Sequence, residues 1–218
     1  MKARAMVKYY DLSHKIENGM TYFPGDPAPK IHPAQGIQNP WMVSEIHFGS
    51  HTGTHIDAPA HYIPGGKTID QYPLDRFIQP GVITPPLNLK DEEPIQPQHI
   101  VETLKLVPKG GALLLQTNWD RFWNTERYFQ HPFLTIPAAE MIINSGIGIL
   151  GIDSLNIDST TQGSSDAHQI LLNQDVLIVE NLTGLLQLTP MMLFRFSFIP
   201  LSLVNLDGSP IRAYATEL

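Results

Sequence analysis

Histidines are concentrated in one short part of this chain. Four of the nine lie within fifteen positions, and residues 51–61 read HTGTHIDAPAH. On a helix, His51 and His55 would share a face, but Asp57 would lie about 200° from His55 and point away. Gly53 also opposes a regular helix and permits tight turning of the backbone. We therefore expect an irregular segment that turns His51, His55 and Asp57 toward one point.

Two imidazoles and a carboxylate form an ordinary ligand set for Zn²⁺, Mn²⁺ or Fe²⁺. The chain has no cysteine, so any metal must be held by His, Asp or Glu. This favours a metal site at His51, His55 and Asp57, and the alternative is a polar loop with solvated histidines. His61 follows Asp57 by four residues and could be a further ligand or a proton-transfer group. The ordinary histidine pKa of about 6.5 suits either role, and spacing does not decide between them.

Composition restricts the possible partners and locations. The net charge is −7 without a long basic run, which argues against nucleic acid as a partner. We find no apolar stretch of about 18 residues, so we expect no membrane-spanning helix. The first residues, MKARAMVKYYDLSH, lack the apolar region of a signal peptide, so we expect a cytoplasmic protein. Charged residues make up only 16%, which suggests that other subunits cover part of the surface.

The elements that must position these residues mix strands and helices without a strict βαβ rhythm, which predicts one mixed α/β domain over residues 1–218. Asp207-Gly208 predicts a hairpin turn before the last strand. Thr135 and Gly146 are placed to cap the second helix. Predicted strands cover residues 9–12, 42–48, 81–84, 112–116, 147–152, 176–179, 194–206 and 211–215, and predicted helices cover 100–106, 137–144 and 167–172.

Residues 51–61 resemble the HxGTHxDxPxH signature of the cyclase-like metal-dependent hydrolases, a family that includes bacterial kynurenine formamidases and isatin hydrolases. The resemblance extends from about residue 9 to residue 215, with further blocks in matching order. These blocks are Phe23-Pro24-Gly25-Asp26, Gly151-Ile152-Asp153-Ser154 with Asp158-Ser159, His168-Gln169-Ile170-Leu171-Leu172, Ile178-Val179-Glu180-Asn181-Leu182, and Asp207-Gly208-Ser209-Pro210-Ile211-Arg212-Ala213.

The resemblance implies a swivelling β/β/α fold in homodimers or homotetramers. It also implies that His51, His55 and Asp57 bind metal, that His168 and Glu180 complete a site for two divalent ions, and that His61 transfers protons. Zn²⁺ is the preferred ion and Mn²⁺ the alternative. Without the resemblance, we would interpret His168 and Glu180 as surface residues, and for Asp153 and Asp158 we favour structural roles.

Aromatic residues distinguish this chain within the family. Phe23 stands where kynurenine formamidases tend to carry tryptophan against the substrate ring, so Phe23 is the predicted substrate contact. The segment of residues 116–130 is also rich in aromatic side chains. They could form the wall of a pocket or an interface, and we favour ordinary packing.

The resemblance implies an amide hydrolase that uses metal-activated water, with a small-molecule substrate. An aryl formamide such as N-formylkynurenine would give kynurenine and formate. One alternative is ring opening of a cyclic amide such as isatin, or hydrolysis of another small carbonyl compound. Another is a protein that binds metal or a small ligand without turnover, or a metal site with a purely structural role.

Overall fold

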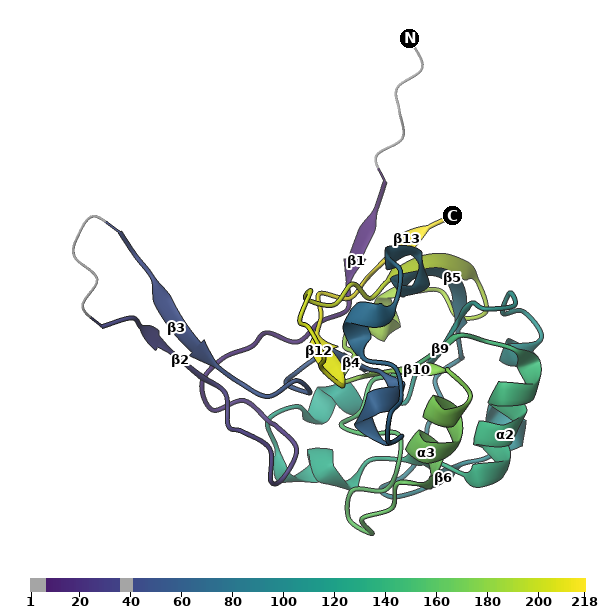
Figure 1. The fold of residues 1–218 in the computed structure, drawn as a ribbon. Coiled ribbons are helices and arrows are strands. Elements are labelled where there is room, and N and C mark those ends of the chain that lie inside the picture. Colours follow the sequence, from purple (N-terminus) through teal and green to yellow (C-terminus); the bar gives the residue numbers. More distant parts are fainter. Residues whose placement is uncertain (1–6, 36–40) are drawn as a thin grey trace.

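The computed structural model describes residues 7–35 and 41–218, so residues 1–6 and 36–40 of the predicted domain lie outside the described residues (Figure 1). Across the described residues, the largest sheet has nine strands in the spatial order β1-β13-β11-β5-β7-β9-β10-β4-β12. In chain order these strands are β1 (Tyr9–Asp11), β4 (His55–Asp57), β5 (Ile78–Ile83), β7 (Ala112–Leu115), β9 (Ile149–Ile152), β10 (Leu177–Glu180), β11 (Leu193–Ser197), β12 (Gly208–Pro210) and β13 (Tyr214–Glu217).

The centre of this sheet is parallel and its flanks are antiparallel. Strands β5, β7, β9 and β10 pair in parallel, while β4 and β11 pair antiparallel with the neighbouring strands β10 and β5. Strands β7, β9 and β10 are buried at every residue, as expected for parallel strands covered on both faces. The predicted α/β class with a mixed sheet is therefore confirmed.

Alternate residues of the central strands pack into two hydrophobic cores. Leu113 and Leu150 face the core that the helices cover, whereas Leu114 and Ile149 face the core shared with β11 and β13. This alternation follows the two-residue period of a strand. The α-helices of the described residues are α1 (Pro97–Leu104), α2 (Ile136–Ser145) and α3 (Asp166–Asn173).

Helix α2 begins and ends where its capping residues predict. The Thr135 hydroxyl accepts a hydrogen bond from the backbone N–H of Ala138, and Gly146 takes a left-handed conformation with φ of 74°. Helix α1, predicted over residues 100–106, begins earlier because Pro97 occupies its first turn and Gln96 forms a capping box with His99.

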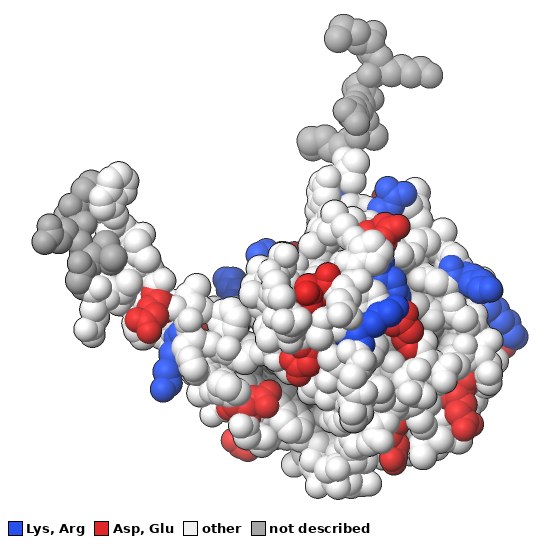
Figure 2. Space-filling view, in the orientation of Figure 1, with Lys and Arg blue, Asp and Glu red and all other residues white. Residues whose placement is uncertain are grey.

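In the part of the chain that the structure describes, four further short strands form two small sheets. Strands β2 (Lys30–Pro33) and β3 (Ser44–His47) pair antiparallel, and β6 (Pro94–Ile95) pairs in parallel with β8 (Phe133–Leu134). The β2–β3 pair extends away from the body of the molecule as an arm (Figure 1). Charged side chains are scattered over the face shown in Figure 2. Among the described residues, no helix is long and apolar enough to cross a membrane.

Two predictions near the end of the chain were wrong. The strand predicted over residues 194–206 ends at Ser197, and Asp207-Gly208 does not form the turn of a hairpin. Instead, Gly208 begins β12, which pairs antiparallel with β4, while β11 pairs directly with β13. The favoured two-residue hairpin turns need positive φ angles, and Gly208 does not adopt one.

Candidate metal centre

Strands β4 and β10 bring three of the predicted metal ligands together. Their antiparallel register places His55 opposite Glu180, and Asp57 lies two residues after His55 on the same face of β4. The prediction of a wholly irregular segment was therefore wrong for residues 55–57, because strand periodicity aligns these side chains. His55 Nε2 lies 3.3 Å from Asp57 Oδ1 and 3.5 Å from Glu180 Oε2.

His51 reaches the same place from the irregular segment before β4. Gly53 turns the backbone with φ of 64°, a conformation that favours glycine. The Nδ1 atom of His51 lies 2.7 Å from Asp57 Oδ1. Ligand atoms of His51, His55 and Asp57 all lie within 4.8 Å of one another, so these residues form a first donor set.

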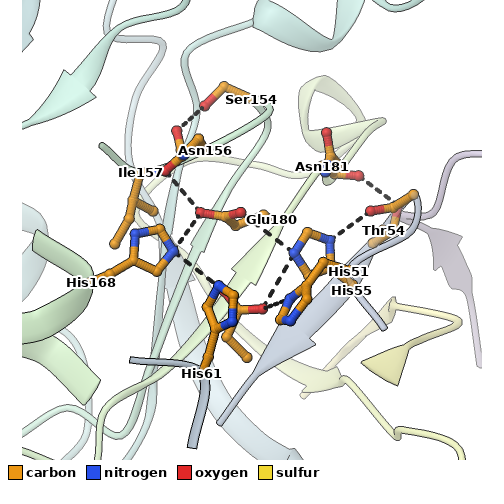
Figure 3. A network of polar contacts seen from close by, with 12 residues as sticks. His51, Thr54, His55, His61, Ser154, Asn156, Ile157, His168, Glu180 and Asn181 are labelled. Atoms are coloured by element: carbon orange, nitrogen blue, oxygen red, sulfur yellow. Dashed lines mark hydrogen bonds and ion pairs between the residues drawn. The ribbon is translucent and has the colours of Figure 1, made fainter. Parts of the chain in front are cut away.

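Helix α3 supplies His168 to a second donor set. His168 Nε2 lies 3.3 Å from Glu180 Oε1 and 3.5 Å from Asp57 Oδ2. Figure 3 shows the rings of His168 and His55 on either side of the Glu180 carboxylate. Ligand atoms of Asp57, His168 and Glu180 also lie within 4.8 Å of one another. The two donor sets therefore share Asp57. Its Oδ1 atom lies near His51 and His55, and its Oδ2 atom lies near His168.

Each histidine of these sets directs one ring nitrogen to the centre and donates a hydrogen bond from the other. His51 Nε2 donates to Asp207 Oδ2, His55 Nδ1 to the carbonyl oxygen of Gly53, and His168 Nδ1 to Asp158 Oδ2, each at 2.8 Å. Metal-ligating histidines have this arrangement, because the outer acceptor fixes the tautomer and the ring orientation.

One oxygen at the centre has no hydrogen-bond partner in the described part of the chain. Asp57 is fully buried, and its Oδ2 atom accepts no hydrogen bond from the described residues. Leaving such an atom unsatisfied is costly, so the position suits a cation. Together with the histidine tautomers, this oxygen indicates that the residues fit a divalent metal.

The charges of the centre depend strongly on one another. Burial alone would lower the pKa of His55, but Asp57 and Glu180 raise it to about 10. Burial would raise the pKa of Glu180, whereas His168 and His55 lower it to about 2. Without metal, imidazolium groups therefore balance the carboxylates. A cation would replace those protons, so metal binding would release protons.

The two structural aspartates lie outside the centre. Asp158 holds the ring of His168 and also accepts the backbone N–H groups of Ala167 and His168 at the start of α3. Asp153 accepts the backbone N–H groups of Thr117 and Asn118 after β7. Burial raises the pKa of Asp153 to about 7.

His61 lies beside the donor sets at the end of a short 3₁₀ helix, Pro59–His61. Its ring is centred 3.9 Å from that of His51, and its Nδ1 donates to Asp207 Oδ2 at 3.1 Å. Asp207 was not among the predicted site residues. The signal for Asp207 was the resemblance of residues 207–213, but only the pairing of β12 with β4 brings that block to the histidines.

A pocket opens onto the donor sets. Its lining includes His61, the predicted substrate contact Phe23, and the aromatic residues Tyr22 and Tyr62. The aromatic side chains of segment 116–130 pack together in a small hydrophobic cluster, in line with the packing interpretation favoured for them. Its Trp119 and Tyr128 are fully buried, and its Trp123 ring stacks on His14.

Comparisons with known proteins agree with this architecture. The sequence model of the Cyclase family, described as "Putative cyclase", matches residues 10–159. Kynurenine formamidase from Paracidovorax citrulli is 30% identical over 220 residues, covering 94% of each chain. Kynurenine formamidase from Bordetella avium is 29% identical over 98% of this chain and 100% of its own length. The chain therefore belongs to the Cyclase family.

Solved structures show the same fold. Isatin hydrolase A from Ralstonia solanacearum superimposes with a TM-score of 0.85 at 21% identity, covering 97% of this chain and 92% of its own. A "predicted metal-dependent hydrolase" from Bacillus stearothermophilus gives a TM-score of 0.82 at 28% identity, covering 98% and 100%. These structures confirm the fold that the motif resemblance implied.

Proposed function

We propose that this protein is a metal-dependent hydrolase that cleaves an aryl formamide, such as N-formylkynurenine, into an aryl amine and formate. The kynurenine formamidases that align along nearly the whole chain support the reaction class. The observation that carries the proposal is the pair of donor sets that share Asp57 beside an aromatic pocket.

Five residues would hold the metal. His51, His55 and Asp57 would bind one divalent ion, and Asp57, His168 and Glu180 would bind a second, with Zn²⁺ preferred and Mn²⁺ the alternative. When bound, a divalent ion lowers the pKa of its water from about 15.7 toward about 7 and polarises a carbonyl group.

His61 would move the proton. Its Nδ1 is engaged with Asp207, and no hydrogen bond to its Nε2 occurs among the described residues. Water would add its oxygen to the formyl carbon, and His61 Nε2 would take the released proton. His61 would then give this proton to the amine nitrogen as the C–N bond breaks. The products are formate and the free amine.

The pocket walls support an aromatic substrate. Phe23 and Tyr62 line the pocket that opens onto the donor sets, and Phe23 keeps 36% of its surface exposed. Such a surface can stack on an aryl ring, so we propose Phe23 as the substrate contact.

A metal analysis combined with a hydrolysis screen tests the proposed function. Protein loaded with Zn²⁺ or Mn²⁺ should hydrolyse N-formylkynurenine and release formate. Preferential ring opening of isatin, or cleavage of simple esters alone, would replace the formamide assignment with another carbonyl substrate. Metal binding without turnover of any of these compounds would indicate a binding protein.

We further propose that residues 1–218 form one domain in a cytoplasmic homodimer or homotetramer. The β2–β3 arm and the residues before β3 support the oligomer, because they expose apolar side chains that a second subunit could cover. Trp41 is 73% exposed, Met42 100% and Ile46 57%. Light scattering of the purified protein would reveal the oligomeric state.

A further inference from the structure

Asp207 is held beside the donor sets by the pairing of β12 with β4. Gly208 lies opposite Asp57 in this pairing, and the carbonyl oxygen of Asp207 accepts the backbone N–H of Ala58 at 2.8 Å. The backbone passes so close that a Cβ atom on Gly208 would lie 2.7 Å from Cε1 of His51. The position of Asp207 relative to the His51 ring is therefore determined by the sheet.

The carboxylate of Asp207 connects two histidines that have different proposed roles. Its Oδ2 atom accepts from His51 Nε2 at 2.8 Å and from His61 Nδ1 at 3.1 Å. Its Oδ1 atom accepts from the hydroxyl of Ser50 at 2.9 Å. A carboxylate oxygen can accept two hydrogen bonds, so Oδ2 can serve both rings at once.

We infer that Asp207 is a positioning residue that fixes the tautomers of both His51 and His61, an inference that rests on the proposed function. With Nε2–H of His51 donated to Asp207, the Nδ1 lone pair of His51 is directed to the metal. With Nδ1–H of His61 donated to the same oxygen, the Nε2 lone pair of His61 is available to accept the proton of water. One carboxylate thus prepares both metal binding and proton transfer.

The competing assignment is that Asp207 itself binds metal. Ligand atoms of His51, His61 and Asp207 also lie within 4.8 Å of one another. That arrangement would need His51 Nε2 as the ligand, while His51 Nδ1 lies 2.7 Å from Asp57 at the first donor set. The unsatisfied oxygen of Asp57 lies at the donor sets rather than at Asp207, which favours the positioning role.

Four variants separate these roles: Asp207→Ala, the nearly isosteric Asp207→Asn, His61→Ala, and the double variant Asp207→Ala/His61→Ala. Metal affinity is measured by competition with a chromogenic chelator, and stoichiometry by elemental analysis at saturating metal. The kcat for the best substrate of the hydrolysis screen is measured on metal-saturated protein. The control is Asp91→Ala, because the Asp91 carboxylate pairs with Arg127 on the surface, outside the donor sets.

The expected effects distinguish the two histidines. Asp207→Ala should weaken metal binding about 10- to 100-fold through His51, with unchanged stoichiometry at saturation, and should lower kcat by a similar factor. His61→Ala should leave metal affinity unchanged. In the His61→Ala background, removing Asp207 should weaken metal binding as before but cause little further loss of kcat, because the two residues act as one unit in catalysis.

Three results would overturn the inference. Loss of a bound ion at saturating metal in both Asp207 variants would make Asp207 a ligand. Unchanged affinity and kcat in Asp207→Asn and Asp207→Ala would leave Asp207 without a role. An equal loss of kcat with and without His61 would show that Asp207 does not act through His61. If wild-type protein hydrolyses no substrate, the proposed function fails, yet the affinity measurements still test the contact with His51.

Discussion

Replacing Asp57 by Asn should affect both donor sets at once. Asp57 is fully buried, and its two oxygens lie near His51, His55 and His168. Asparagine has nearly the same shape but lacks the negative charge. The substitution therefore replaces the charged ligand shared by the two sets with a neutral amide that keeps one oxygen, with little change in volume.

The loss of metal affinity should be large. Removing an outer partner of a ligand typically costs about 10- to 100-fold in affinity. Asp57 is a proposed direct ligand, so at least about 100-fold is expected at each site, which corresponds to about 2.7 kcal/mol. Glu180→Gln is the matched control, since Glu180 belongs to the second set alone and the first ion should remain.

The metal-free protein should also be destabilised by the Asp57→Asn substitution. Removing one partner of a buried ion pair typically costs about 3–5 kcal/mol. Each 1 kcal/mol lowers the melting temperature of a domain of this size by about 2–4 °C. The Asp57→Asn variant should therefore melt at least about 6 °C below the wild type when both are measured at pH 6 with a chelator present.

The pH dependence of this destabilisation has a defined sign. Burial alone would lower the pKa values of His51 and His55, but Asp57 and neighbouring carboxylates raise them to about 9 and about 10. A raised histidine pKa contributes stability that is complete below about pH 6.5 and is lost as the pH rises through the folded pKa. The difference between variant and wild type should thus shrink between pH 6.5 and about 10.

Thermal unfolding in chelator across that pH range, together with elemental analysis after reconstitution, measures these effects. Two bound ions in the Asp57→Asn variant at wild-type affinity would refute the shared ligand. Equal melting temperatures of the metal-free proteins at pH 6 would refute the buried ion-pair network.

Three further substitutions test other contacts. His61→Ala should keep the fold and the metal but lower kcat about 10²- to 10⁴-fold, and near-normal turnover would exclude proton transfer by His61. Gly208→Ala places a Cβ atom 2.7 Å from the His51 ring. The substitution should therefore lower the free energy of unfolding by about 1–3 kcal/mol and weaken metal binding. Wild-type stability together with wild-type metal affinity would contradict the close approach. Phe23→Ala should raise KM for an aryl formamide by a few-fold to about tenfold with little change for an aliphatic formamide, and an equal change for both would argue against aryl stacking.

Local sequence patterns determined several parts of this protein. Thr135 and Gly146 delimit α2, because capping and left-handed turns depend on residues close in the chain. The apolar strands around residues 112–115 and 149–152 were also predictable from the local sequence, because strands buried on both faces are continuous apolar runs. The spacing of His51, His55 and Asp57 likewise indicates a common ligand set, because all three residues lie within seven positions of the chain.

Tertiary structure decided which distant residues join that set. Without the family resemblance, Glu180 and His168 would be interpreted as surface residues, and only the register of β10 with β4 and the packing of α3 bring them to Asp57. The Asp207-Gly208 dipeptide predicted a hairpin locally, yet β12 pairs with β4 and places Asp207 against two histidines. Strand pairing depends on contacts between segments far apart in the chain, which local propensity does not encode.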